Sequence, residues 1–222
     1  MICRKFLTLV GLPIFILSPA YAAETNNAAG LETTNAVSAW VPGNANLWLA
    51  GMPDGSIAGN KFDVAPDQSP IEVKHIPIQP DEILTFSAAG GVANGPFQLA
   101  GADGIDTYIV SRVPGAENGI SDITAPIDGL IGVFLDDSAP SNFAPSTGLD
   151  FSTASNRDFA TLYPQLRQPF FIGDGKDAAG GVQQFVAPAG ATRLFLGTMD
   201  SYEWADNRGS FTVQVSIVPK SP

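Results

Sequence analysis

The sequence contains few of the residues that carry nucleophilic, redox or transition-metal chemistry. One cysteine, Cys3, and one histidine, His75, occur in 222 residues. A structural zinc site takes four Cys or His ligands, so these two residues cannot build one. A Ser-His-Asp mechanism would have to use His75, and no Gly-x-Ser-x-Gly motif supplies its serine. The adjacent carboxylates Asp136 and Asp137 end an apolar run and indicate a turn rather than a glycosidase pair. We therefore expect no enzyme.

Positively charged residues are also scarce. The chain has 11 Lys and Arg against 22 Asp and Glu, a formal net charge of −11. Such a surface repels phosphate backbones, so we expect no nucleic-acid partner. An acidic excess by itself commonly serves solubility outside the cell, and it does not indicate metal binding.

The apolar run at the N-terminus is too short to span a bilayer comfortably. Residues 6–17 are apolar, interrupted by Pro13, and follow the positive pair Arg4-Lys5. Ala20-Tyr21-Ala22 has the small-x-small pattern of a cleavage site. We interpret residues 1–22 as a signal peptide, which predicts a secreted or periplasmic protein. Cys3 leaves with that segment, so the mature chain has no disulfide.

No stretch of the sequence carries a long apolar period of 3.6 residues. Short apolar runs bounded by turn residues occur instead, at residues 47–50, 83–86, 130–135, 170–172 and 194–196. In residues 211–217, apolar side chains alternate with polar ones, which predicts a strand with one buried face. These patterns predict an all-β protein, an antiparallel β-sandwich of the jelly-roll or galactose-binding-domain-like type.

The composition along the chain predicts a single domain after a polar lead-in. Residues 23–38 are polar and irregular, and we expect a flexible lead-in there. Residues 39–219 are enough for a single β-sandwich domain. Within it, a short helix in residues 158–166 would be disrupted by Pro164, and we expect a long surface loop in residues 101–119. No apolar tail follows Ile217, so we expect no transmembrane anchor in the mature chain.

The loop between the last two predicted strands is rich in oxygen-bearing side chains. It carries Asp200, Glu203, Asp206 and Asn207, and Gly209 follows it. Calcium takes six to eight ligands from carboxylates, amides and carbonyls, so this loop is a candidate Ca²⁺ site. The spacing is not that of an EF-hand, and a solvated acidic hairpin loop is the alternative interpretation.

The same loop resembles that of a lectin family. The run Asp206-Asn207-Arg208-Gly209-Ser210-Phe211 is similar to the calcium loop of the bacterial galactophilic PA-IL (LecA-like) lectins. Residues 47–55 and 183–190 resemble runs in larger exported bacterial proteins of that type. Those lectins are small β-sandwiches in which Ca²⁺ binds sugar hydroxyls directly. The resemblance implies side-chain ligation by Asp200, Asp206 and Asn207, and ligation by the carbonyl of Glu203.

Two further stretches resemble that family less closely. Residues 78–90 are similar to the strand that supplies one more backbone carbonyl, which places Ile78 as a ligand where the family has tyrosine. Asn118 takes the place of a glutamine in the sugar-specificity loop, and Val113 or Arg112 stands in place of the family's histidine. These differences imply a changed sugar preference.

The resemblance also implies how carbohydrate would bind. A calcium ion with open coordination positions accepts two vicinal hydroxyls, whose protons then face the ligating carboxylates. We expect a galactose-like or other glycan to contact five residues: Asn118, Asp200, Ser201, Tyr202 and Trp204. The alternative is a calcium-stabilised structural or adhesion module that binds no sugar. Either protein is compatible with a homo-oligomer.

Overall fold

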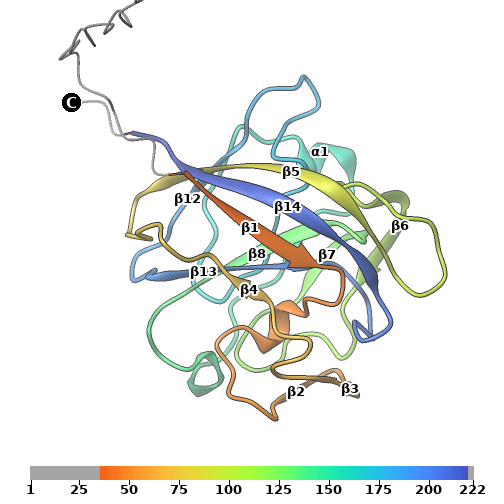
Figure 1. Cartoon of the computed structure of the whole chain (residues 1–222). Helices are drawn as coiled ribbons and strands as arrows, with labels where there is room; N and C mark the ends of the chain where they lie inside the picture. The colour runs from red at the N-terminus through yellow and green to blue at the C-terminus, as the bar shows by residue number, and fades with distance from the viewer. Residues whose placement is uncertain (1–35, 220–222) are drawn as a thin grey trace, which may run out of the picture. The chain divides into compact units, whose positions relative to one another are not determined.

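The computed structural model describes residues 36–219, which form two main sheets packed into a β-sandwich (Figure 1). The first sheet has the order β1-β14-β5-β12-β10, and the second has the order β11-β8-β13-β4. The bounds of the first are Ala36–Pro42, Arg208–Ile217, Ile83–Ala93, Gln184–Val186 and Thr161–Leu162. Those of the second are Phe170–Phe171, Leu130–Leu135, Arg193–Thr198 and Ile71–Glu72. The expected all-β class is confirmed.

Two small sheets and three helical turns complete the described chain. The small sheets are β2 (Ile57–Ala58) with β3 (Asn60–Val64), and β6 (Ile105–Ser111) with β7 (Ile123–Ile127) and β9 (Leu149–Asp150). The turns are η1 (Leu47–Leu49), η2 (Pro140–Asn142) and α1 (Ala154–Arg157). Within residues 36–219, none of the helices has the length and apolar character needed to span a bilayer.

The core lies between the two main sheets and is rich in aromatic rings. Phe185 of β12 is fully buried, and its ring centroid lies 5.0 Å from that of Phe86, 5.4 Å from Phe170 and 5.6 Å from Phe159. The predicted alternation in β14 is also present, with Phe211 and its apolar neighbours inward and polar residues outward. These contacts join both sheets through side chains of distant strands.

Two local expectations differ from the structure, and a third cannot be compared with it. β1 begins at Ala36, inside the expected lead-in of residues 23–38, because its backbone pairs with β14 from Ser216 to Ser210. The apolar run at residues 47–50 forms the 3-10 turn η1, capped by the Asn46 side chain, which accepts from the Trp48 N–H at 3.1 Å. The predicted signal peptide lies outside the described residues and stays a prediction.

One more expected element, between residues 101 and 119, differs from the structure. The expected surface loop of residues 101–119 contains β6, which pairs with β7. No helix forms in residues 158–166, as expected from Pro164, and the one short α-helix of the described chain, α1, ends at Arg157. Pro164 and the pairing of β10 with β12 keep the following chain extended.

The aromatic core gives a direct test of the packing. Phe185→Ala should lower the free energy of unfolding by about 3–5 kcal/mol, because it leaves a cavity among three other rings. Urea denaturation followed by fluorescence measures this change. Tyr163→Ala, at a side chain that is 73% exposed, is the control and should change stability by less than about 0.5 kcal/mol. Equal effects of the two variants would contradict the assigned core.

Candidate metal centre and the loop that carries it

The acidic loop of residues 200–207 crosses from one sheet to the other. It leaves β13, which pairs with β8, and enters β14, which pairs with β5. At its start, the Asp128 N–H donates to the Met199 carbonyl at 2.7 Å. At its end, Arg208 is paired with Ala93, so Asn207 lies beside Asn94. The loop therefore meets the β7–β8 turn and the end of β5 at one edge of the sandwich.

One buried carboxylate from outside the loop holds the loop in shape. Asp63 of β3 is fully buried and accepts four hydrogen bonds. The donors are the backbone N–H groups of Trp204 at 3.1 Å and Ala205 at 2.9 Å, and the side-chain amides of Asn46 at 3.2 Å and Asn60 at 3.1 Å. Burial raises the pKa of Asp63, and the two backbone donors oppose that rise. Nothing in the sequence pattern around Asp63 indicated this role.

Trp204 lies in the core, so the expectation that it contacts sugar is corrected. Its side chain is fully buried, and its ring centroid lies 5.5 Å from that of Trp48. The indole N–H donates to the Thr198 carbonyl at 2.8 Å. A ring with no exposed face offers no platform for a sugar, and Trp204 anchors the loop instead.

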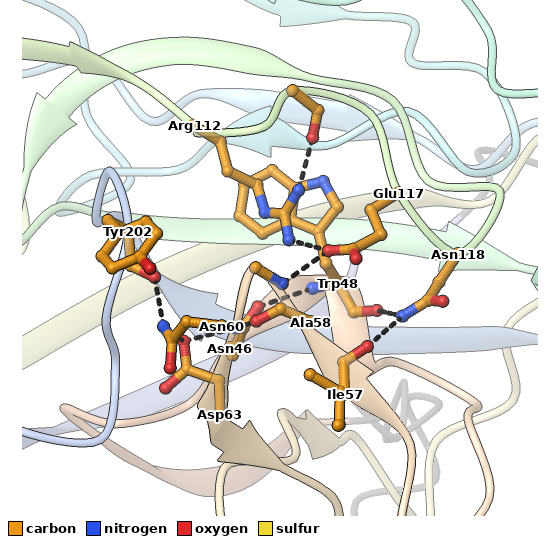
Figure 2. A network of polar contacts seen from close by, with 12 residues as sticks. Asn46, Trp48, Ile57, Ala58, Asn60, Asp63, Arg112, Glu117, Asn118 and Tyr202 are labelled. Carbon is orange, nitrogen blue, oxygen red and sulfur yellow. Dashed lines mark hydrogen bonds and ion pairs between the residues drawn. The ribbon is translucent and has the colours of Figure 1, made fainter.

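Tyr202 is the exposed aromatic residue of the loop. Its side chain is 48% exposed, while its carbonyl accepts a hydrogen bond from the Asn60 amide at 2.7 Å (Figure 2). The preceding carbonyl, of Ser201, accepts from the Val113 N–H at 2.6 Å. The backbone at Ser201 and Tyr202 is thus fixed from two sides, and the phenol ring stays available.

The neighbouring loop is built around a buried arginine. The Arg112 guanidinium lies 4.6 Å from the Trp48 ring centroid and pairs with Glu117 (Figure 2). Burial lowers the pKa of Arg112, and Glu117 opposes that effect. Glu117 also accepts from the Gly59 N–H at 2.7 Å, which ties this loop to β2 and β3. Arg112 is therefore committed inside the protein and does not face a ligand.

Asn118 is likewise engaged in holding the loops together. Its amide nitrogen donates to the Trp48 carbonyl at 2.9 Å and to the Ile57 carbonyl at 3.3 Å. The residue is half-buried and has a left-handed backbone with φ of 51°. Its amide donors are used, so the expected sugar contact would fall to its carbonyl oxygen alone.

A cluster of unpaired oxygen atoms lies where the loop meets the β7–β8 turn and the end of β5. Both carboxylate oxygens of Asp128 and the amide oxygens of Asn94 and Asn207 are buried and have no hydrogen-bond partner. Asp200, 5% exposed, lies next to them, and burial raises the pKa of Asp128, with a smaller contribution from the negative charge of Asp200. We call these four residues the oxygen cluster. Asp128 and Asn94 were missed in the sequence, because neither adjoins the acidic loop.

The electrostatics of the oxygen cluster favour a bound cation. Burial, with Asp200 nearby, raises the pKa of Asp128 to about 7. Burial also raises the pKa of Asp200, opposed by the nearby Asn207 amide and by the backbone N–H groups of Ser201 and Tyr202. A buried carboxylate without a partner costs several kcal/mol. Hard cations such as Ca²⁺ prefer this set of carboxylate and amide oxygens.

The other expected ligands lie in different settings. Asp206 is exposed, and its carboxylate lies beside Gly95, the residue that follows Asn94. Glu203 is half-buried at the turn of the loop. Within residues 36–219, no three His, Cys, Asp or Glu side chains are grouped so that they could hold a metal ion. Any cation here therefore depends on amide and carbonyl oxygens beside Asp128 and Asp200.

Ile78 lies away from the oxygen cluster. It precedes β5, whose first residues pair with the far end of β14, Leu84 with Ile217. The cluster adjoins the opposite end of β5, after Ala93, so the length of an 11-residue strand separates the two. The assignment of Ile78 as a ligand is corrected: the residues that β5 brings to the loop follow the strand instead of preceding it.

Comparison with known proteins identifies no family for the chain. No protein-family model matches it, and no curated protein matches it. Among solved structures, the N-terminal domain of EclA, a PllA-like lectin, is similar over 83% of this chain and 98% of that chain, with 13% identity and a TM-score of 0.30. That score is too low to assign a function.

The role of Asp63 leads to a prediction about the loop. Asp63→Asn should lower the free energy of unfolding by about 3 kcal/mol, because an amide cannot accept from all four donors. Near-ultraviolet circular dichroism should also change, since Trp204 is anchored by this residue's hydrogen bonds. Asp67→Asn, at an exposed side chain, is the matched control and should leave both signals unchanged. An unchanged spectrum for Asp63→Asn would contradict this role.

Proposed function

We propose that the protein binds Ca²⁺ at the loop of residues 200–207, and binds carbohydrate through that ion. The observation that carries the proposal is the set of buried, unpaired oxygens of the oxygen cluster. In proteins, buried polar atoms are nearly always paired, and an unpaired group calls for a bound ion or water. Asp200 and Asn207 supply side-chain oxygens, with Asp206 and the Glu203 carbonyl at the rim of the loop. The bound ion would supply open coordination positions for sugar hydroxyls.

The proposal of carbohydrate binding draws on the exposed part of the same loop. Ser201 and Tyr202 lie directly after Asp200, and their backbone is fixed by hydrogen bonds from Val113 and Asn60. A fixed aromatic side chain contributes contact area at a low entropic cost on binding. Tyr202 therefore takes the platform role that was expected of Trp204. The expected export signal in residues 1–22 accords with a protein that meets glycans outside the cytoplasm.

A second candidate function is a calcium-stabilised structural or adhesion module without sugar binding. Two observations favour it. Trp204 is buried in the core, and the Asn118 amide nitrogen is committed to the Trp48 and Ile57 carbonyls. In that case Ca²⁺ would stabilise the loop, and binding would occur through another surface.

Calcium should raise the melting temperature of the purified protein. At a concentration of 100 times Kd, a ligand that binds only the folded state adds about 2.7 kcal/mol, or about 5–10 °C for a domain of this size. Scanning calorimetry with Ca²⁺ and with a chelator measures the shift. Asp200→Asn should lose most of it, whereas Asp54→Asn, at an exposed carboxylate, should keep it. No shift for the unmodified protein would contradict calcium binding.

Glycan binding should depend on both the ion and Tyr202. A glycan array should give signal with Ca²⁺ and none with a chelator, because the hydroxyls bind the ion. Tyr202→Ala should weaken binding to the array by about tenfold, in line with the loss of one aromatic contact of about 1–1.5 kcal/mol, and should leave the calcium-induced stabilisation intact. Tyr163→Ala is the control and should bind as before. Signal that survives chelation would contradict the mechanism, and an empty array with a normal thermal shift would favour the structural module.

A further inference from the structure

Asp128 is the residue of the oxygen cluster whose buried carboxylate forms no hydrogen bond. It lies in the turn between β7 and β8, with a left-handed φ of 66°. Its N–H donates to the Met199 carbonyl at 2.7 Å, and the Gly129 carbonyl accepts from the Met199 N–H at 2.8 Å. These two bonds clamp the turn to the end of β13, directly before Asp200. The backbone therefore fixes where the carboxylate of Asp128 lies.

The turn itself does not account for an aspartate at this position. Aspartates in turns usually accept a hydrogen bond from a backbone N–H two residues later. Within residues 36–219, four others do so at 2.8–3.0 Å, Asp136 from Ser138, Asp150 from Ser152, Asp174 from Lys176 and Asp177 from Ala179, and Asp200 accepts from Tyr202 at 3.4 Å. Asp128 has no exposed surface, and neither of its oxygens has a partner. Its side chain is thus held in the interior for a reason other than turn geometry.

The charges around Asp128 have one sign. Asp200 is its charged neighbour, and the backbone of Asn94 favours the ionised carboxylate without forming a hydrogen bond of normal geometry. None of the ion pairs formed within residues 36–219 includes Asp128 or Asp200. Two carboxylates and two amide oxygens without a basic residue form a set that a divalent cation would neutralise and coordinate.

We propose that Asp128 is a direct ligand of the cation bound at the loop of residues 200–207, and that it closes the site from the interior of the protein. This inference rests on the proposed calcium binding. Asp128 then takes the ligand role that was expected of Ile78, and the exposed side of the loop is left for water or hydroxyl groups.

Calorimetric titration of Ca²⁺ into the full chain tests the inference, with luminescence of bound Tb³⁺ excited through the nearby tryptophans as a second readout. Asp128→Asn keeps the size and shape of the side chain, and asparagine tolerates the left-handed backbone at this position. Calcium affinity should fall at least tenfold, because a charged ligand is lost. The melting temperature of the calcium-free protein should stay the same or rise, because an unpaired buried charge is removed. Asp54→Asn is the matched control, and Asp200→Asn is the reference for a lost loop ligand.

The outcomes separate this inference from the proposed function. If Asp200→Asn loses affinity and Asp128→Asn does not, Asp128 is no ligand and the inference is wrong while calcium binding stands. If Asp128→Asn lowers only the stability of the calcium-free protein, its role is structural and the inference is also wrong. If the unmodified protein binds neither Ca²⁺ nor Tb³⁺, the proposed function itself fails. Asp128→Gly, which suits the same φ, supplies the measurement if the asparagine variant does not fold.

Discussion

The shape of the loop at residues 200–207 depends on the carboxylate of Asp63. This loop carries three acidic side chains, and their mutual repulsion disfavours a compact loop conformation. Four donors converge on Asp63, two from the loop backbone and two from asparagine side chains. The loop is therefore organised by a buried anion that is fully satisfied, before any ion or ligand binds. Such preorganisation lowers the entropic cost of binding at the loop.

The sheet order explains why polar residues that are far apart in the sequence meet at one place. β13 and β14 are consecutive in the chain but belong to different sheets, so the connection between them must cross the edge of the sandwich. β8 and β5 are their respective partners, so the start of β8 and the end of β5 bring Asp128 and Asn94 to the same edge. The oxygen cluster is thus a product of strand pairing, and the acidic loop supplies only part of it.

This dependence on pairing also sets what the sequence could predict. Alternation of apolar and polar residues identified β14, and oxygen-rich composition identified the loop at Asp200, because both signals are local. Asp63, Asn94 and Asp128 are more than 70 residues away from Asp200 and lie in unremarkable turns or strands, so no local pattern marks them. Ile78 was misplaced for the same reason: choosing the residue that β5 brings to the loop requires the register of β5 against β14.

The core of the fold and the oxygen cluster use separate sets of atoms. The rings around Phe185 and the hydrogen bonds to Asp63 involve none of the unpaired oxygens. The protein should therefore fold without a cation, and an ion would act mainly on the local repulsion between Asp128 and Asp200. The aromatic residues of the loop are divided in the same way between core and surface, since Trp204 is buried in the core and Tyr202 is exposed. Ion binding in this chain would then order the exposed edge of the loop, and it would stabilise the sandwich through the binding free energy alone.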